Sequence, residues 1–302
     1  MSLYRLHSIF VDTTDLPVSR VGCAAGGEIR AEPSSETAFS HFSALVAATP
    51  RLEFDTPAIN RALGVCALAG VDIGQLTNGL IVWMAKMDGN GIAAGAAHRK
   101  LTIKSGVLVP RTLTCASNTD ASLSYEAVIT YDGTNSPIAI QDGQNLPGLQ
   151  MDNDKYSLGP ITLESIAFGD VESLTIDFGI GVETKSPDSY IWPKRATIQT
   201  TVPKLSLKGD DPEWFKSTAI PIDGKAITHA NTKLYLRKRD GQGFEPNGNS
   251  VHTKFTAAGT AHIPNPFSAG LAEAGETDLE CVCHEDTNNN DPIIPTPNTA
   301  IS

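Results

Sequence analysis

Two stretches of this chain repeat one another. "LIVWMAKMDGNGIAAGAAHRKLTI" runs from Leu80 to Ile103, and "KLYLRKRDGQGFEPNGNSVHTKFT" runs from Lys233 to Thr256, about 150 residues later. Each begins with an apolar run typical of a β-strand, passes an Asp-Gly turn and a loose loop, and enters a second strand-like run at His-x-Lys. The matching residues are Lys86, Asp88, Gly89, Gly91 and His98 in the first stretch, and Lys238, Asp240, Gly241, Gly243 and His252 in the second.

Shorter matches extend the repeat over most of the chain. "LHSI" at Leu6–Ile9 corresponds to "LESI" at Leu163–Ile166, and "PRLEF" at Pro50–Phe54 corresponds to "PKLSL" at Pro203–Leu207. Because the matches keep their order along the chain, they indicate a duplicated unit rather than chance similarity. We therefore expect a first unit, a linker, a second unit and a tail, over residues 1–133, 134–159, 160–286 and 287–302.

The linker and the tail are expected from composition. Residues 134–159 are rich in Gly, Pro, Asn and Asp, which is typical of a connecting segment. Residues 287–302 contain a run of Asn and three prolines, and this composition predicts a tail without a fold of its own.

Short strands dominate the elements that the sequence predicts. The runs "RLEFDT" at 51–56 and "ASLSYEAVITYD" at 121–132 alternate apolar and polar residues, as strands with one buried face do. The remaining strands are similarly short, and Gly and Pro punctuate them. The predicted fold class is α+β and strand-dominated, with two tandem antiparallel β-sandwich or barrel units that each carry one flanking helix.

One helix is predicted in each unit. In the first, "TPAINRALGVCALAG" places Thr56 at the N-cap, Pro57 at the first helical position and Gly70 at the C-terminal end. In the second, the shorter "DDPEWFKST" at 210–218 stands in the same place. The segment "AFSHFSALVAA" at 38–48 fits either a short helix or an extended arm.

Charge and cysteine content narrow the classes of function. The net charge is −11, and residues 151–302 hold the larger share of the excess acid. Nonspecific binding to nucleic acid is therefore not expected, since it depends on Lys and Arg that neutralise phosphates. The five cysteines are odd in number and irregular in spacing, so we expect reduced thiols packed as small apolar groups. The first residues lack the features of a signal peptide, which predicts folding in a reducing cytosol.

A search for catalytic or metal-binding motifs finds none of the common ones, and we expect no enzyme activity and no cofactor. "CVCHED" invites a metal-site interpretation, but Cys281 and Cys283 would point to one face of a strand and His284 to the other. No cysteine stands at the corresponding place in the first unit. His98 and His252 are matched without a matched nucleophile or carboxylate pair, so a role in loop geometry or at an interface is favoured over catalysis.

The two matched loops are the candidate functional elements. "DGNG" and "DGQG" each offer one carboxylate where a calcium loop needs several, so they are interpreted as turns that need positive φ. The segments 88–99 and 240–252 are longer than tight turns. A repeated long loop without catalytic residues indicates a contact with a neighbouring subunit, and this hypothesis assigns Lys86, Asp88, Gly89, Gly91, His98, Lys238, Asp240, Gly241, Gly243 and His252 to assembly.

The chain resembles the tail tube proteins of long-tailed bacteriophages. "PRLEFDTPAINRAL", "NGLIVWMAKMDGNG" and "HRKLTIKSGVLVP", with their counterparts in the second unit, carry this resemblance. The family implies a small β-sandwich with one flanking helix and a long loop between central strands. Most relatives place single-unit subunits in six-fold rings, and a minority resemble this chain in fusing two units and forming trimeric rings.

The resemblance also implies a function and partners. Stacked rings would enclose a channel through which DNA passes without base recognition, and an acidic wall would keep DNA from adhering. Implied partners are further copies of the chain, the tape measure protein, and tail tip or terminator proteins, with no membrane. The implied location is the phage tail within the virion, assembled in the cytoplasm of the host bacterium.

Two other classes of function remain open. A distal tail or adaptor protein would share the fold. A secreted or virion-borne binding module with two sandwich domains, for a glycan or receptor, would need matched aromatic platforms. Trp83 lies in an apolar run, and Trp192 and Trp214 have no counterparts in the first unit, so support for this alternative is thin.

Overall fold

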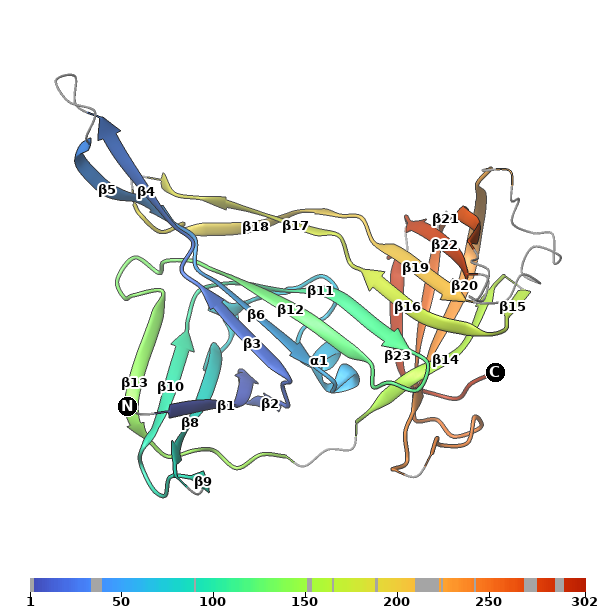
Figure 1. Ribbon diagram of the computed structural model, residues 1–302, viewed down its shortest axis with the longest axis horizontal. Coiled ribbons are helices and arrows are strands. Elements are labelled where there is room, and N and C mark those ends of the chain that lie inside the picture. Colours follow the sequence, from blue (N-terminus) through green and yellow to red (C-terminus); the bar gives the residue numbers. More distant parts are fainter. Residues whose placement is uncertain are drawn as a thin grey trace.

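The fold is known from a computed structural model, in which strands form nearly all of the regular structure (Figure 1). It describes residues 3–33, 40–89, 91–150, 154–164, 166–187, 190–209, 223, 225–241, 243–268, 276–285 and 291–302. The strand pairs recorded in these ranges are all antiparallel, and one α-helix lies within them. The predicted fold class, α+β and strand-dominated, is confirmed.

A first sheet belongs to the N-terminal half of the chain. Its strand order is β13-β10-β8-β1-β2, and the short β9 pairs with β8. The bounds are β1 (Leu3–Val11), β2 (Thr14–Leu16), β8 (Leu80–Asp88), β9 (Gly91–Ile92), β10 (His98–Ile103) and β13 (Ile138–Gln144).

A second, longer sheet runs through both halves. Its order is β15-β14-β20-β21-β22-β19-β16-β11-β12-β6-β3, while β23 also pairs with β21 and β7 with β11. The bounds are β3 (Arg20–Ala24), β6 (Arg51–Thr56), β7 (Val71–Asp72), β11 (Gly106–Ala116), β12 (Ser122–Ile129), β14 (Tyr156–Leu163), β15 (Ile166–Phe168), β16 (Val171–Asp177), β19 (Lys204–Gly209), β20 (Ile227–Lys238), β21 (His252–Ser268), β22 (Glu276–Cys283) and β23 (Ile293–Thr299).

Two hairpins extend from the body as arms. The first arm consists of β4 (Gly27–Pro33) and β5 (Ser40–Ala48), and the second of β17 (Ile180–Lys185) and β18 (Arg195–Thr201). In Figure 1 the first arm projects away from the molecule, whereas the second runs back along the first half above β11. Of the two structures that fitted residues 38–48, the extended arm is the one that forms over the described part, Ser40–Ala48.

The helix of the first half is shorter than predicted. α1 covers Ile59–Val65, with Ala58 as its N-cap residue, and a 3₁₀ turn, η1, follows at Ile73–Gln75. The hydroxyl of Thr56 still accepts a hydrogen bond from the Ala58 N–H at 3.2 Å, so it holds the turn before the helix. The second predicted helix, at 210–218, lies outside the described residues.

The expected linker and tail both contain a strand, so the tail is not the irregular segment that its composition predicted. β13, within 134–159, pairs with β10, and β23, within 287–302, pairs with β21. The physical reason is the same at both sites, because Ile138 or Ile293 opens the strand beside a buried neighbour, at the Ile138–Ile103 and Ile293–Ala257 pairs. Prolines in β23 are tolerated because proline fits an edge strand.

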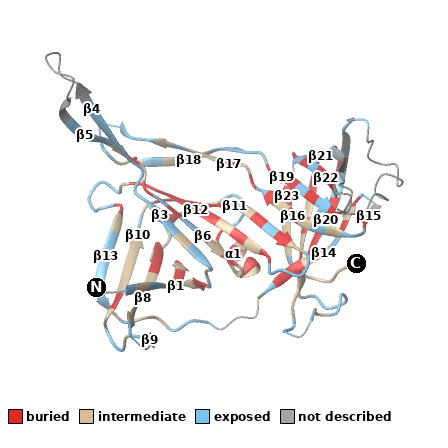
Figure 2. Cartoon of the chain, viewed as in Figure 1, coloured by how far each residue is buried: buried red, intermediate tan, exposed pale blue. Residues whose placement is uncertain are grey.

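The order of strand pairing in the first half recurs in the second. β8 lies between β1 and β10, and β20 lies between β14 and β21. β12 lies between β6 and β11, and β22 lies between β19 and β21. The long β21 therefore takes the places of both β10 and β11. Buried apolar side chains fill both halves (Figure 2).

The arms leave the body through matched glycine kinks. Gly26 and Gly179 have φ of 58° and 57°, and their carbonyls accept hydrogen bonds from the N–H groups of Thr49 and Val202. A Cβ on Gly179 would lie 2.0 Å from the Val202 carbonyl oxygen, and one on Gly26 would lie 2.3 Å from that of Thr49. Only glycine fits these positions, so the backbone fixes the direction of each arm.

We predict that Gly179→Ala destabilises the fold. The substitution forces a left-handed conformation on alanine and a collision with backbone, which together cost on the order of 2–4 kcal/mol. The measurement is the free energy of unfolding in denaturant. Gly22→Ala is the control, because a Cβ there meets nothing within 4 Å. Equal stability of the two variants would contradict the role of the kink.

Candidate assembly surfaces

The matched histidines hold the bases of the two loops. Nδ1 of His98 accepts a hydrogen bond from the Lys86 N–H at 3.1 Å, and Nδ1 of His252 accepts one from the Lys238 N–H, also at 3.1 Å. Both rings are buried. This supports the role in loop geometry that the sequence favoured for the two histidines.

The matched glycines form turns, but the first loop is less loose than predicted. Gly89 and Gly241 have positive φ, as expected for the two Asp-Gly turns. After Asp88 the chain folds back, and β9 pairs with β8 through Asp88–Gly91. In the second loop, the carboxylate of Asp240 accepts a hydrogen bond from the Gly243 N–H at 2.5 Å. Figure 1 shows β9 and the orange loop after β20 at the same lower side of the molecule, opposite the arms.

The two halves meet through strand pairing, which the sequence did not predict. β11 pairs with β16 from Thr112–Asp177 to Ala116–Ser173, so two four-stranded segments become parts of one sheet. Helix α1 adds a second contact, because Asn60 donates to the Tyr156 hydroxyl at 2.7 Å and accepts from the Thr253 hydroxyl at 2.5 Å. The halves are thus joined by backbone hydrogen bonds and by buried polar contacts.

The second arm is docked on the first half. Near its tip, the carbonyl of Pro193 accepts from the Tyr131 N–H at 2.8 Å, and the Trp192 ring lies 5.4 Å from the Tyr131 ring. Along its length, Ile198 packs against backbone, since a Cβ on Gly70 would lie 3.0 Å from Ile198 Cδ1. A cleft of about 490 Å³ remains between β18 and the first half.

An ionic cluster lies at the root of this arm. The buried Glu126 accepts hydrogen bonds from Arg51 and from Arg111, each at 2.5 Å, and Arg111 also donates to the Ile180 carbonyl. Two cations therefore neutralise one buried carboxylate, and one of them also binds the arm backbone. Arg51 and Arg111 are 47% and 30% exposed, so removing one of them should cost less than the ~3–5 kcal/mol of a fully buried pair.

Two strand edges in the long sheet have no further partner among the described residues. β3 pairs with β6 alone, and from His262 to Ser268 β21 pairs with β22 alone. By position in the pairing order, β3 corresponds to β16 and this part of β21 corresponds to β11. The two edges without a further partner therefore correspond to β16 and β11, the strands that join the halves.

Cys281 differs from the packed apolar thiol that the sequence predicted. Its Sγ lies 2.6 Å from Nε2 of His229, and the ring's Nδ1 lies 2.8 Å from the Thr232 hydroxyl. A hydrogen bond from the Cys283 thiol, followed by the contact with His229, lowers the pKa of Cys281 from 9.0 to about 6 despite its burial. Cys66 and Cys115 do fit the prediction, since burial raises their pKa to about 12.

The described residues contain no group of three or more His, Cys, Asp or Glu side chains that could hold a metal ion. His229 was not singled out from the sequence. Its hydrogen-bond partner Thr232, a polar residue three positions later in the same strand, is the signal that could have found it. His284 is exposed and its ring bonds the Glu285 carbonyl. The structure therefore does not bring Cys281, Cys283 and His284 together around one point.

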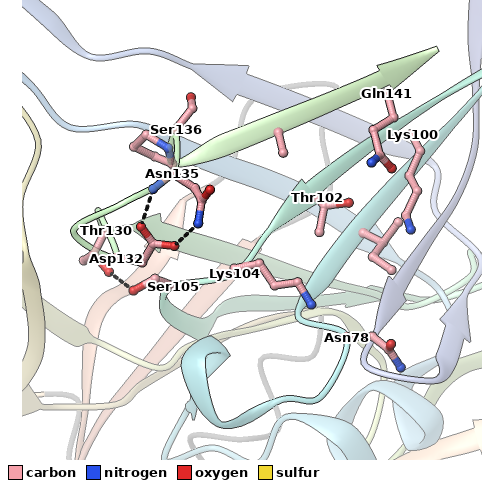
Figure 3. Close-up of a pocket in the computed structure, with 13 residues that line it drawn as sticks. Asn78, Lys100, Thr102, Lys104, Ser105, Thr130, Asp132, Asn135, Ser136 and Gln141 are labelled. Atoms are coloured by element: carbon pink, nitrogen blue, oxygen red, sulfur yellow. Dashed lines mark hydrogen bonds between the residues drawn. The ribbon is translucent and has the colours of Figure 1, made fainter.

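A polar recess of about 290 Å³ lies beside β10 and β13 (Figure 3). Its one carboxylate, Asp132, accepts hydrogen bonds from the N–H groups of Thr134 and Asn135 at 2.8 and 2.7 Å. The amide of Asn135 adds a third bond, and these contacts lower the pKa of Asp132. The lining of the recess holds Lys100 and Lys104 but no histidine or cysteine. The recess therefore lacks a paired acid and base.

No family model matches this chain, and no curated protein matches it. Within the part of the chain that the structure describes, no helix is long and apolar enough to cross a membrane. The candidate functions therefore depend on the strand edges, arms and loops described above.

We predict that Cys281→Ala changes the pH dependence of stability but not assembly. Because the folded state lowers the pKa of Cys281, the unfolded chain binds more protons between about pH 6 and 9, and wild-type stability rises with pH there. Cys281→Ala should flatten this rise in thermal unfolding curves, whereas the exposed Cys23→Ala should leave it unchanged. Parallel curves for wild type and Cys281→Ala would contradict the thiolate assignment.

Proposed function

We propose that the chain is a structural subunit of a bacteriophage tail tube, built from two copies of one tail-tube unit. Three chains form a ring with approximate six-fold symmetry, and stacked rings enclose a channel for DNA. The observation that carries the proposal is the β11–β16 junction, which joins two similarly paired halves into one sheet.

The proposed ring repeats one contact. A head-to-tail contact that is used once can be used again, and closed rings form when its rotation closes. Inside the chain, β11 of the first half binds β16 of the second. Between chains, the equivalent contact would bring residues 262–268 of β21 against β3 of the next copy, since both edges are unpaired among the described residues. The long sheet would then continue from chain to chain, without an exposed edge at β3 or at residues 262–268.

The outward face of the shared sheet supports a solvated channel wall. Glu53, Asp177, Ser206 and Lys208 are exposed residues of its strands, while apolar residues face the core. The net charge of −11 is consistent with a wall that repels DNA. The acidic residues of the second half are expected to contribute the larger part of this charge.

A distal tail or adaptor protein would use the same ring contact, so it stays as an alternative within this proposal. The binding-module alternative receives less support. The Trp192 ring packs on Tyr131 of the same chain, Trp83 lies under Lys100, and Trp214 lies outside the described residues. No matched pair of exposed aromatic platforms is present among the described residues.

We predict trimeric rings for the purified protein. Light scattering should give about three times the chain mass of 32.0 kDa for the smallest closed species. Class averages of assembled tubes, viewed down the axis, should show three-fold symmetry with six similar lobes and a central channel. Six chains in a ring, or rings without a channel, would rule the proposal out.

We also predict that the matched loops stack one ring on the next. Replacing residues 89–96 by a tight turn, while keeping Lys86 and His98, should leave a folded ring that no longer forms tubes, and replacing 241–249 should do the same. Electron microscopy measures tube formation, and thermal unfolding checks the fold. Tubes of normal length from either variant would contradict the assignment of the loops to ring stacking.

A further inference from the structure

The two arms have the same internal geometry. In the first arm Gly27 pairs with Ala48 and Ile29 with Leu45, and in the second Ile180 pairs with Thr201 and Val182 with Ile198. Both registers shift at the same place, just before Ile29 and just before Val182. With the matched kinks at Gly26 and Gly179, this makes the arms equivalent structures that leave equivalent positions of the body.

One arm is covered and the other is not. Val182 and Ile198 of the second arm are half-buried and pack against the core of their own chain. Their counterparts Ile29 and Leu45 are 71% and 45% exposed. The same cross-strand apolar pair is therefore buried in one arm and left in solvent in the other.

The second arm lies at one end of the outward face of β11 and β12. Along β12 every residue from Tyr125 to Ile129 is buried, so both faces of the strand are covered there. Glu126 and Val128 are the buried residues that face outward. Thr130, just beyond the strand, is also buried. The arm accounts for this cover, since Ile180 bonds Arg111 beside Glu126 and Pro193 bonds Tyr131.

The equivalent face of the second half is open. Gly106 pairs with Ile129 in the first half, and Gly259 pairs with Cys283 in the second. Val128 and Val282, each one residue earlier in its strand, are therefore counterparts. Val128 is 0% exposed and Val282 is 38% exposed. The neighbours of Val282 on this face, Glu280 and His284, are exposed as well, so β22 alternates where residues 125–129 of β12 are all buried.

A cavity lies where the tip of an arm would bind. In the first half, the tip of the second arm is held by the N–H groups of Ala48 and Tyr131. Their counterparts, Thr201 and Glu285, both line an open cavity of about 720 Å³. Val202 and Val282, 47% and 38% exposed, contribute apolar surface to the same cavity.

From these observations we infer that the first arm, β4–β5, binds the open face of β22 on a second copy of this chain. Ile29 and Leu45 pack there as Val182 and Ile198 pack within the chain, and the first residue of β5, Ser40, lies beside Glu285 at the edge of the cavity. The inference rests on the ring proposed above and adds a second contact to it. The occupant is a lateral neighbour, because the covered arm crosses from one half to the adjacent half in the same sheet.

Disulfide cross-linking tests the contact directly. Ser40 and Glu285 are the counterparts of Pro193 and Tyr131, whose backbones are joined by a 2.8 Å hydrogen bond. In a Cys23→Ser background, oxidation of chains carrying Ser40→Cys and Glu285→Cys should give dimers and trimers linked between chains. The matched control, Pro193→Cys with Tyr131→Cys, should form a disulfide within one chain.

Two substitutions test the arm and the receiving face of β22 independently. Ile29→Asp and Val282→Asp both alter exposed side chains, so each should leave thermal stability unchanged and weaken association by about ten- to hundredfold. Mixing the two variants restores one intact contact and should give discrete dimers. Ile140→Asp is the control, because Ile140 is 61% exposed on β13 and away from both surfaces.

The outcomes distinguish this inference from the proposed function. Rings that form normally from Ile29→Asp chains, without cross-linking at Ser40 and Glu285, would overturn the arm contact and leave the ring standing. Cross-linked ladders longer than three chains would show that the arm reaches a stacked copy, which also overturns the lateral contact. A wild-type chain that stays monomeric would overturn the ring itself.

Discussion

The antiparallel pairing of β11 with β16 is the interaction on which the arrangement of the whole molecule depends. It makes one sheet of two similarly ordered halves, and it fixes where the second arm must lie, because β17 continues directly from β16. Among the residues that the structure describes, β3 and residues 262–268 of β21 each have one partner strand in the same sheet. In the ring that we propose, the chain carries one copy of the contact inside itself and offers the two surfaces of the same contact to its neighbours.

Hydrophobic alternation and turn chemistry made much of the fold predictable. "RLEFDT" alternates and is buried at Leu52 and Phe54, and the Asp-Gly turns have the positive φ expected of Gly89 and Gly241. The edge strands were missed because an edge strand needs few apolar residues, and the short apolar runs at Ile138 and Ile293 lie in polar, proline-containing surroundings. The α1 helix was predicted too long because local capping preferences cannot anticipate the turn that places Val71 beside β11.

The candidate surfaces were predicted less completely than the fold. The matched loops stood out because Lys, Asp, Gly and His recur at nearly constant spacing. The arms and the strand edges did not, because their equivalence lies in register and backbone conformation rather than in shared side chains. Ile29 matches Val182 only as an apolar residue, and Thr49 matches Val202 only through its N–H. Likewise, the His229–Cys281 contact joins residues 52 positions apart, which no local pattern reports.

If the first arm binds a second copy as we propose, the glycine kink at its root has a consequence for the rate of association. Since Gly26 leaves no room for a Cβ and its carbonyl is bonded to Thr49, the base of the arm has a set direction before any neighbour arrives. The entropy of orienting the arm is lost during folding of the single chain and not during the encounter of two chains. Productive collisions then need only the correct approach of two preformed surfaces, so subunits can add quickly at low concentration without a slow ordering step.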